Sequence, residues 1–278
     1  MRSGVTVASA ASAIAAVFAQ ERQERIVGLL AEEGRVRVAD LAARFGVSTV
    51  TIRKDLALLE GEARLSRTHG GAIVMRSTGA AEPSFEIRER LQRDQKVAIG
   101  AAAASLINDG ESIAFDASTT ALYVARQLLG REWHHLTVVT NSIRIALELA
   151  GKTGISVVML GGRVRSEALS VVGPLGDAVF RRVNVQKAFV GAVGLTLDVG
   201  LTDAMEDEAQ IKRSMVTAAR EVYALVDHTK WGRAAAATFC RIDGLTGVVA
   251  DAEAPADLVA GLRARGIDVV LVEAGGRR

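Results

Sequence analysis

The sequence of 278 residues contains few of the residues that cross-link a fold through disulfides or bound metal ions. Its single cysteine, Cys240, excludes an internal disulfide, and four scattered histidines leave too few partners for a zinc site. One cysteine also indicates a reducing cytoplasm. Aromatic residues make up only 4%, so the core has to be built mainly from Ala, Val, Leu and Ile. A net charge of +2 is too mild to indicate nucleic-acid binding by itself.

The sequence also lacks the short motifs of several enzyme classes. It has no Walker A loop, no dinucleotide-binding fingerprint and no Gly-x-Ser-x-Gly nucleophile elbow. It does have an ordinary globular composition, with 49% hydrophobic and 24% charged residues. At roughly 150 residues per domain, its length predicts one large domain or two.

The first residues of the chain imitate a secretion signal. Arg2 precedes an uncharged, Ala-rich stretch, and residues 17–19 resemble a small-residue cleavage site. Glycine, threonine and serine interrupt this stretch, so it is too weakly apolar to span a membrane. We expect residues 1–16 to form a disordered, dispensable leader, and a signal peptide is the alternative.

Residues 17–75 are predicted to form a small helical domain. An apolar stripe at helical spacing marks a first helix, and residues 38–45 form a second that ends at Gly46. Ser48 is a candidate N-cap for a third helix that reaches about residue 60. Two short helices separated by a glycine turn are typical of a helix-turn-helix. The alternation that follows predicts a hairpin, which would form a wing.

The third helix would expose Thr49, Thr51, Arg53 and Lys54, in the half where a recognition helix meets base edges and phosphates. The plainer interpretation is a small helical domain with a solvated charged face. Specific segments favour DNA binding: Glu24-Arg25-Ile26, Val38-Ala39-Asp40-Leu41-Ala42, Val47-Ser48, Thr51-Ile52-Arg53-Lys54-Asp55-Leu56 and Arg67-Thr68-His69-Gly70-Gly71-Ala72.

These segments closely resemble the N-terminal DNA-binding domain of the DeoR family of bacterial transcriptional regulators. The resemblance implies that operator DNA is contacted by the recognition helix and by the wing. The implied contacts are Ser48, Thr49, Thr51, Arg53 and Lys54 on the helix, and Arg67 and His69 in the wing.

Residues 76–84 are small and polar and include Gly79 and Pro83, which predicts a linker. Residues 85–278 then alternate short apolar strands with helices, which predicts an α/β domain with a mostly parallel sheet covered on both faces. The predicted strands are 112–115, 136–140, 155–160, 187–190, 222–226, 246–250 and 269–272. The predicted helices are 94–106, 120–129, 143–150, 204–219 and 255–265.

Polar residues follow several of these strands, where ligands bind in such sheets. Ser118 and Thr119 stand where a helix begins, so their hydroxyls and backbone N–H groups could hold a phosphate. Arg163 and Lys230 could add positive charge. The plainer interpretation is that Ser118, Thr119 and Ser142 are helix caps.

Two further features at these positions have competing interpretations. Asp116 and Asp227 would repel a phosphate, so we expect them to accept hydrogen bonds from sugar hydroxyls. Together these positions imply a small polyol with an anionic end. Glu208 and Lys212 stand four apart on one predicted helix, which is also the spacing of an ordinary surface ion pair. Gly161-Gly162 is equally consistent with a simple turn.

The segments that carry these residues are 115–120, 138–142, 160–163, 187–191, 208–213 and 227–232. They resemble the C-terminal sensor domain of the same family, which is similar to ribose-5-phosphate isomerase and typically binds phosphorylated sugars. The resemblance runs from about residue 17 to the end of the chain. Many members have glycine where this chain has Ser118. The implied effector-binding residues are Asp116, Ser118, Thr119, Thr120, Asn141, Gly162, Arg163, Glu208, Lys212, Asp227 and Lys230.

The sequence therefore predicts a cytoplasmic repressor of sugar-metabolism genes that a phosphorylated sugar releases from DNA. A homodimer or homotetramer is expected because a helix-turn-helix usually binds a palindrome, and no membrane, metal or cofactor is expected. The alternative is a sugar-phosphate isomerase with Asp116, Glu208 or Asp227 as acid–base groups and Lys212 as electrostatic stabiliser. An isomerase has no use for a helix-turn-helix, which favours the regulator.

Overall fold

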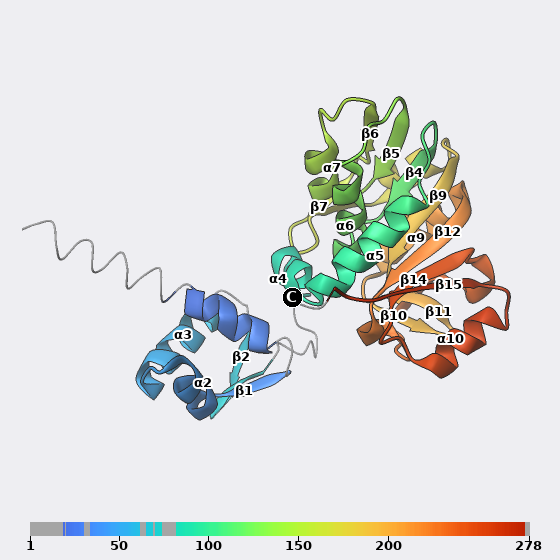
Figure 1. The fold of residues 1–278 in the computed structure, drawn as a ribbon. Coiled ribbons are helices and arrows are strands. Elements are labelled where there is room, and N and C mark those ends of the chain that lie inside the picture. The colour runs from blue at the N-terminus through green and yellow to red at the C-terminus, as the bar shows by residue number, and fades with distance from the viewer. Residues whose placement is uncertain are drawn as a thin grey trace, which may run out of the picture. The chain divides into compact units, whose positions relative to one another are not determined.

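The computed structural model describes residues 19, 21–30, 34–61, 65–68, 70–73 and 82–275 (Figure 1). The chain divides into two compact units, Met1–Leu91 and Gln92–Arg278. The expected leader, most of the expected linker, and His69 lie outside the described residues. None of the helices in the described part is long and apolar enough to cross a membrane.

The N-terminal unit is a helix-turn-helix with a hairpin. Residues 21–30 are helical, and β1 (Arg35–Arg37) leads into α2 (Val38–Phe45). The turn after α2 starts at Gly46, whose positive φ of 63° closes the helix with a hydrogen bond to Ala42. The recognition helix α3 (Thr49–Gly61) follows, and then β2 (Ser66–Thr68) and β3 (Gly71–Ile73). The three strands pair in the order β1-β3-β2, so the predicted hairpin is confirmed and β1 adds to it. This unit also includes α4 (Phe85–Arg90).

Aliphatic side chains from each of these helices form the core of the N-terminal unit. Ile52, Leu56 and Leu59 on α3 are fully buried against Ile26 and Leu30. Asp55 lies on the same buried face. It accepts hydrogen bonds from Arg22 Nε at 2.7 Å and from Gln23 Nε2 at 3.0 Å. Asp55 therefore fixes the recognition helix to the first helix.

The C-terminal unit is built on a seven-stranded parallel sheet with strand order β15-β14-β12-β9-β4-β5-β6. Its strands are β4 (Ser112–Phe115), β5 (Leu136–Thr140), β6 (Ile155–Met159), β9 (Val185–Gly191), β12 (Ala219–Val226), β14 (Gly247–Asp251) and β15 (Asp268–Val272). These are the seven strands that the sequence predicted, with bounds that differ by a few residues. The α/β fold class is confirmed.

Helices cover both faces of this sheet (Figure 1). They are α5 (Arg93–Ser105), α6 (Thr119–Leu128), α7 (Ile143–Leu149), α8 (Pro174–Phe180), α9 (Glu206–Ala218) and α10 (Ala256–Arg263). Ala188 and Val190 of β9 share one core cluster with Ile211 and Met215 of α9. Phe189 between them faces the other side, because successive side chains of a strand alternate. There it stacks with Tyr223, at 5.5 Å between ring centroids.

The sequence did not predict the short antiparallel elements beside the main sheet. Strands β7 (Arg163–Arg165) and β8 (Ser170–Val172) form a hairpin. A small sheet joins β10 (Gly194–Thr196), β11 (Gly200–Asp203) and β13 (Ala237–Cys240). Helices α4 and α8 were missed as well. Such strands of three or four residues are too short to show an apolar run or an alternation, so tertiary pairing alone defines them.

Candidate functional site

The carboxyl ends of the parallel strands meet at one edge of the sheet, and the predicted effector residues follow them there. Asp116 follows β4, Asn141 follows β5 and Asp227 follows β12. Helix α9 brings Glu208 and Lys212 to the same edge, where they contact Asn141 and Asp116 respectively. The structure thus joins residues that lie far apart in the sequence.

Lys212 is the centre of a buried network of charges. Its Nζ lies 2.9 Å from Asp116 Oδ2 and donates to Asp203 Oδ2 at 2.7 Å. It also donates to the carbonyl of Gly191 at 2.9 Å, and it lies over the ring of Phe239. Lys212 is 6% exposed and Asp116 is fully buried. Two carboxylates and one backbone carbonyl therefore fix the position of the Lys212 ammonium.

In this network, the attraction between opposite charges offsets the cost of burying each charged group. Burial alone would lower the pKa of Lys212, but the carboxylates of Asp203 and Asp116 outweigh it and raise that pKa well above its usual value. Burial alone would raise the pKa of Asp203, but the Lys212 ammonium outweighs it and lowers that pKa. Both groups are therefore charged at neutral pH.

Asp116 also fixes the loop that begins α6. Its Oδ1 accepts hydrogen bonds from the Ser118 hydroxyl at 2.6 Å and from the Ser118 N–H at 3.2 Å. Its Oδ2 accepts the N–H of Gly191 at 3.0 Å. The backbone of Gly191 passes so close to this loop that a Cβ there would lie 2.5 Å from the Cβ of Ser118. Only glycine fits at position 191 opposite a serine.

A second buried network surrounds Glu208. Its Oε1 accepts hydrogen bonds from Arg165 at 2.6 Å and from the hydroxyl of Ser170. Its Oε2 accepts the side-chain N–H of Asn141 at 3.3 Å, and Asn141 also donates to the carbonyl of Val171. All four of the bonded side chains are less than 9% exposed. The Oδ1 of Asn141 is buried and accepts no hydrogen bond from any residue that the structure describes.

The surface-pair interpretation of Glu208 and Lys212 is wrong. The spacing of four residues does place them on one face of α9, but that face is buried against the strand ends. In the described part of the chain, each side chain bonds to residues from other elements and not to its neighbour on the helix. Their common face therefore spans two adjacent networks.

The serine caps that the sequence offered as the plainer interpretation are confirmed. Ser118 accepts the N–H of Ala121 at 3.1 Å at the start of α6, and Ser142 accepts that of Ile145 at 3.2 Å at the start of α7. Thr119 and Thr120 form the first buried turn of α6. Capping occupies only part of a helix N-terminus, whose first N–H groups have no partners within the helix itself.

Gly162 and Arg163 lie at the start of the β7–β8 hairpin. Gly162 has a φ of 144°, and a Cβ there would lie 2.4 Å from the carbonyl oxygen of Val172, so the turn itself requires a glycine. Arg163 is exposed and pairs with Asp207 on the first turn of α9. The next arginine, Arg165, bonds directly to the buried Glu208. The sequence did not predict this contact.

Asp227 and Lys230 occupy the turn after β12. Asp227 is 1% exposed and caps the short helix η1 (His228–Lys230) by accepting the N–H of Thr229 at 3.0 Å. Lys230 is half-buried. Among the described residues, neither Asp227 nor Lys230 forms a hydrogen bond or ion pair with the Lys212 network or the Glu208 network. The structure therefore places them at the same sheet edge without joining them to those networks.

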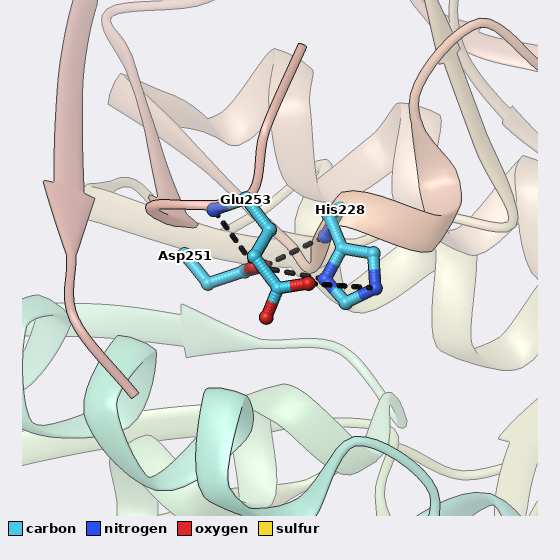
Figure 2. A group of neighbouring side chains, drawn as sticks. All are labelled: His228, Asp251 and Glu253. Atoms are coloured by element: carbon cyan, nitrogen blue, oxygen red, sulfur yellow. Dashed lines mark hydrogen bonds and ion pairs between the residues drawn. The ribbon is translucent and has the colours of Figure 1, made fainter. Parts of the chain in front are cut away.

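His228 in the same turn forms a group with Asp251 and Glu253 (Figure 2). One possible ligand atom from each of these residues lies within 4.8 Å of the others. Histidine and carboxylate side chains are common metal ligands, and the sequence did not indicate that these three residues lie together. Asp251 accepts the backbone N–H of His228 at 2.7 Å, and its other oxygen lies 2.8 Å from His228 Nδ1. Because both carboxylate oxygens already contact His228, we interpret Asp251 as a structural residue that holds this turn against the end of β14.

The sequence did not predict three residues of the two networks: Asp203, Arg165 and Ser170. Each lies on one of the short antiparallel strands, outside the family-like segments. Asp203 directly precedes the predicted helix 204–219, but that position alone does not indicate a contact with Lys212. Nothing in the sequence marks Arg165 and Ser170 as facing inward.

The recognition helix α3 presents the predicted DNA contacts to solvent. Ser48, Thr49, Arg53 and Lys54 are exposed, and Thr51 is half-buried. The Ser48 hydroxyl accepts the N–H of Thr51 at 3.1 Å, so Ser48 is the N-cap that the sequence predicted. Neither Arg53 nor Lys54 forms an ion pair with another described residue, so this helix presents two cations to solvent.

Arg67, the described wing residue, lies on β2. Its backbone N–H donates to Glu60 Oε1 at 2.9 Å, and its guanidinium lies 3.8 Å from Glu60 Oε2. Its side chain remains 41% exposed. This contact fastens the wing to the end of α3 and leaves the guanidinium accessible.

Comparison with known proteins identifies both units. Residues 22–78 match the DeoR-like helix-turn-helix domain, and residues 91–252 match the DeoR C-terminal sensor domain. A putative aga operon transcriptional repressor of Escherichia coli O157:H7 is 33% identical over 253 residues, which cover 91% of this chain and 93% of that protein. The repressor GlcR of Bacillus subtilis is 35% identical over 216 residues, covering 78% and 82%.

The chain belongs to the DeoR family of transcriptional regulators. Its relatives are named as regulators or repressors, so the isomerase alternative is set aside. Among solved structures, ribose 5-phosphate isomerase A of Methanocaldococcus jannaschii is similar at a TM-score of 0.37 and 20% identity, over 50% of this chain and 54% of that one.

Proposed function

We propose that this protein is a repressor whose affinity for operator DNA falls when a phosphorylated sugar binds at the strand ends of the C-terminal unit. The helix-turn-helix and the repressors among its relatives support the DNA-binding half of this proposal. The sensor domain and two buried polar networks support the effector half.

The observation that carries the effector site is the side-chain oxygen of Asn141. The amide N–H groups of Asn141 face two acceptors, Glu208 and Val171, so its orientation is fixed by its neighbours and Oδ1 must point the other way. Leaving a buried acceptor unpaired costs about 1–3 kcal/mol. A ligand hydroxyl that donates to Oδ1 removes this cost, and a sugar supplies such hydroxyls.

The proposed effector residues fall into two groups: those that position other residues and those that would contact the phosphate. Asp116, Lys212 and Glu208 are held by several partners each, so they act as a rigid frame that sets the positions of Asn141 and of the α6 loop. The phosphate would lie at the N-terminus of α6, near Ser118, Thr119 and Thr120, where the helix dipole favours an anion. The Lys212 and Glu208 networks together hold three carboxylates and two cations, so they do not attract an anion by themselves. Arg163 and Lys230 would supply the positive charge.

Several further features complete the proposal. Gly162 would keep the β7 turn in place, and Asp227 would accept a hydrogen bond from a sugar hydroxyl. Ser48, Thr49, Thr51, Arg53, Lys54, Arg67 and His69 would contact the operator. A dimer or tetramer in the cytoplasm would present two recognition helices to a palindromic site.

A thermal-shift screen tests the effector site. A ligand that binds only the folded state raises the melting temperature. The full-length protein is heated with a panel of sugar phosphates, with the matching unphosphorylated sugars and with inorganic phosphate. We expect a shift from one or more sugar phosphates that exceeds the shift from either part alone.

The variant Asn141→Ala should abolish that shift, because it removes the unpaired acceptor. The exposed Asn184→Ala is the matched control and should keep it. If no sugar phosphate raises the melting temperature, or if Asn141→Ala responds as strongly as the control, the effector proposal is wrong.

A further inference from the structure

An apolar side chain stands in the middle of the DNA-facing surface of α3. Val50 is 57% exposed, although it lies in the first turn of a helix whose other aliphatic residues are mostly buried. At about 3.6 residues per turn, Val50 falls between Arg53 and Lys54 around the helix and one turn before them. Thr49 is exposed beside it. The buried residues Ile52, Leu56 and Leu59 define the opposite side.

We propose that Val50 reads a thymine in the operator through van der Waals contact between its isopropyl group and the C5-methyl group of the base. This inference rests on DNA binding by α3 and assigns one position of its specificity. The N-terminal half of a recognition helix lies deepest in the major groove, where the thymine methyl is the apolar group that a base pair presents. The two flanking cations, Arg53 and Lys54, favour the approach of negatively charged DNA to this part of the helix.

Exposure of a branched aliphatic residue here has no stabilising role in the free domain. Valine is a weaker helix former than alanine, and its side chain gains little from packing when it is mostly exposed. The same helix has a second exposed aliphatic residue, Leu58, at 58%, but it lies in the C-terminal half. Leu58 is therefore a matched control of similar size, exposure and chemistry on one element.

The test uses duplexes selected from a randomised DNA pool by the full-length protein. Each thymine of the selected site is replaced in turn by uracil, which removes only the methyl group. For the wild-type protein we expect one thymine in each half-site at which uracil weakens binding about three- to fivefold, the value for one buried methyl-sized group. This penalty should not change between about 50 and 200 mM salt, because no charge is involved.

Val50→Ala should bind the thymine and uracil duplexes equally at that position, and Leu58→Ala should keep the wild-type penalty. Thermal melting of the variants checks that both are folded. The proposal is overturned if uracil has no effect at any thymine, or if Val50→Ala keeps the full penalty. It is also overturned if Val50→Ala changes only the oligomeric state, since the face would then bind a second copy of the chain. Failure to select any site would instead contradict DNA binding by α3 as a whole.

Discussion

The Nζ of Lys212 lies 2.9 Å from Oδ2 of Asp116, and this contact joins α9 to the end of β4 inside the protein. Asp116 in turn holds Ser118 and Gly191, so one lysine determines the geometry of the loop that begins α6. Because Asp203 shares the ammonium, the removal of Lys212 would leave two buried carboxylates without their cation.

We therefore expect Lys212→Met to lower the free energy of unfolding of the C-terminal unit by about 3–5 kcal/mol, the cost of leaving a buried charge uncompensated. Both tryptophans, Trp133 and Trp231, belong to this unit, so their fluorescence during urea denaturation reports on it.

Lys152→Met, in the turn after α7, serves as a control and should change stability by no more than about 0.5 kcal/mol. Addition of Asp116→Asn and Asp203→Asn to Lys212→Met should recover part of the loss, because no charge is then left unpaired. A loss equal to that of the control would contradict the network as described.

The close approach of Gly191 to Ser118 predicts a dependence between the two positions. Gly191→Ala alone should destabilise the protein by about 1–3 kcal/mol, because the new Cβ lies within 2.6 Å of the Ser118 side chain. Ser118→Gly removes the opposing atoms; it costs a few tenths of a kcal/mol as a cap and also loses the hydroxyl that donates to Asp116. The double variant should therefore be more stable than the sum of the two single effects implies. Strict additivity in urea denaturation would show that the backbone relieves the clash in another way.

The lowered pKa of Asp203 predicts how acid affects stability. A carboxyl group whose folded-state pKa lies below its ordinary value of 3.8 stabilises the protein at every pH above that value. The contribution is lost as the pH falls from 3.8 through the lower folded-state pKa. The stability advantage of wild type over Asp203→Asn should thus be constant near neutrality and shrink below pH 3.8. An advantage that stays constant through acid pH would mean that Asp203 is not charged in the folded protein.

On the DNA side, Arg53→Ala should weaken binding to a selected operator by about 1–3 kcal/mol, because an exposed arginine at this position of α3 can donate two hydrogen bonds to a guanine. Binding to random duplex should change much less. Fluorescence anisotropy titrations of both duplexes measure the difference. An equal loss on the two duplexes, together with a salt slope smaller by about one, would assign Arg53 to a phosphate instead.

The main sheet could be predicted from sequence because its strands are short apolar runs separated by helical segments, and its central strands β4, β5 and β9 are buried on both faces. The polar residues at their ends could be predicted for the same reason, since parallel strands bring their carboxyl ends to one edge. The partners of those residues could not. Arg165 and Ser170 face Glu208 only because the β7–β8 hairpin folds over α9, and Asp203 meets Lys212 through a short antiparallel strand. Pairings of this kind depend on tertiary contacts that no local pattern encodes.

The same limit explains the surface-pair interpretation of Glu208 and Lys212. Four-residue spacing correctly places both side chains on one face of α9, but spacing does not state whether that face is exposed. Burial of the face follows from how α9 packs against the sheet.

The proposed function requires that effector binding and DNA binding oppose each other. The direct measurement is a titration of operator binding with and without a saturating sugar phosphate found by the thermal-shift screen, followed by titration of the sugar phosphate with and without operator. We expect the effector to weaken operator binding by about 1–3 kcal/mol, the common range for such coupling, and the operator to weaken effector binding by the same factor. In Asn141→Ala, which should not bind the effector, operator affinity should be insensitive to it. An effector that binds the wild-type protein and leaves operator affinity unchanged would contradict the proposed release from DNA.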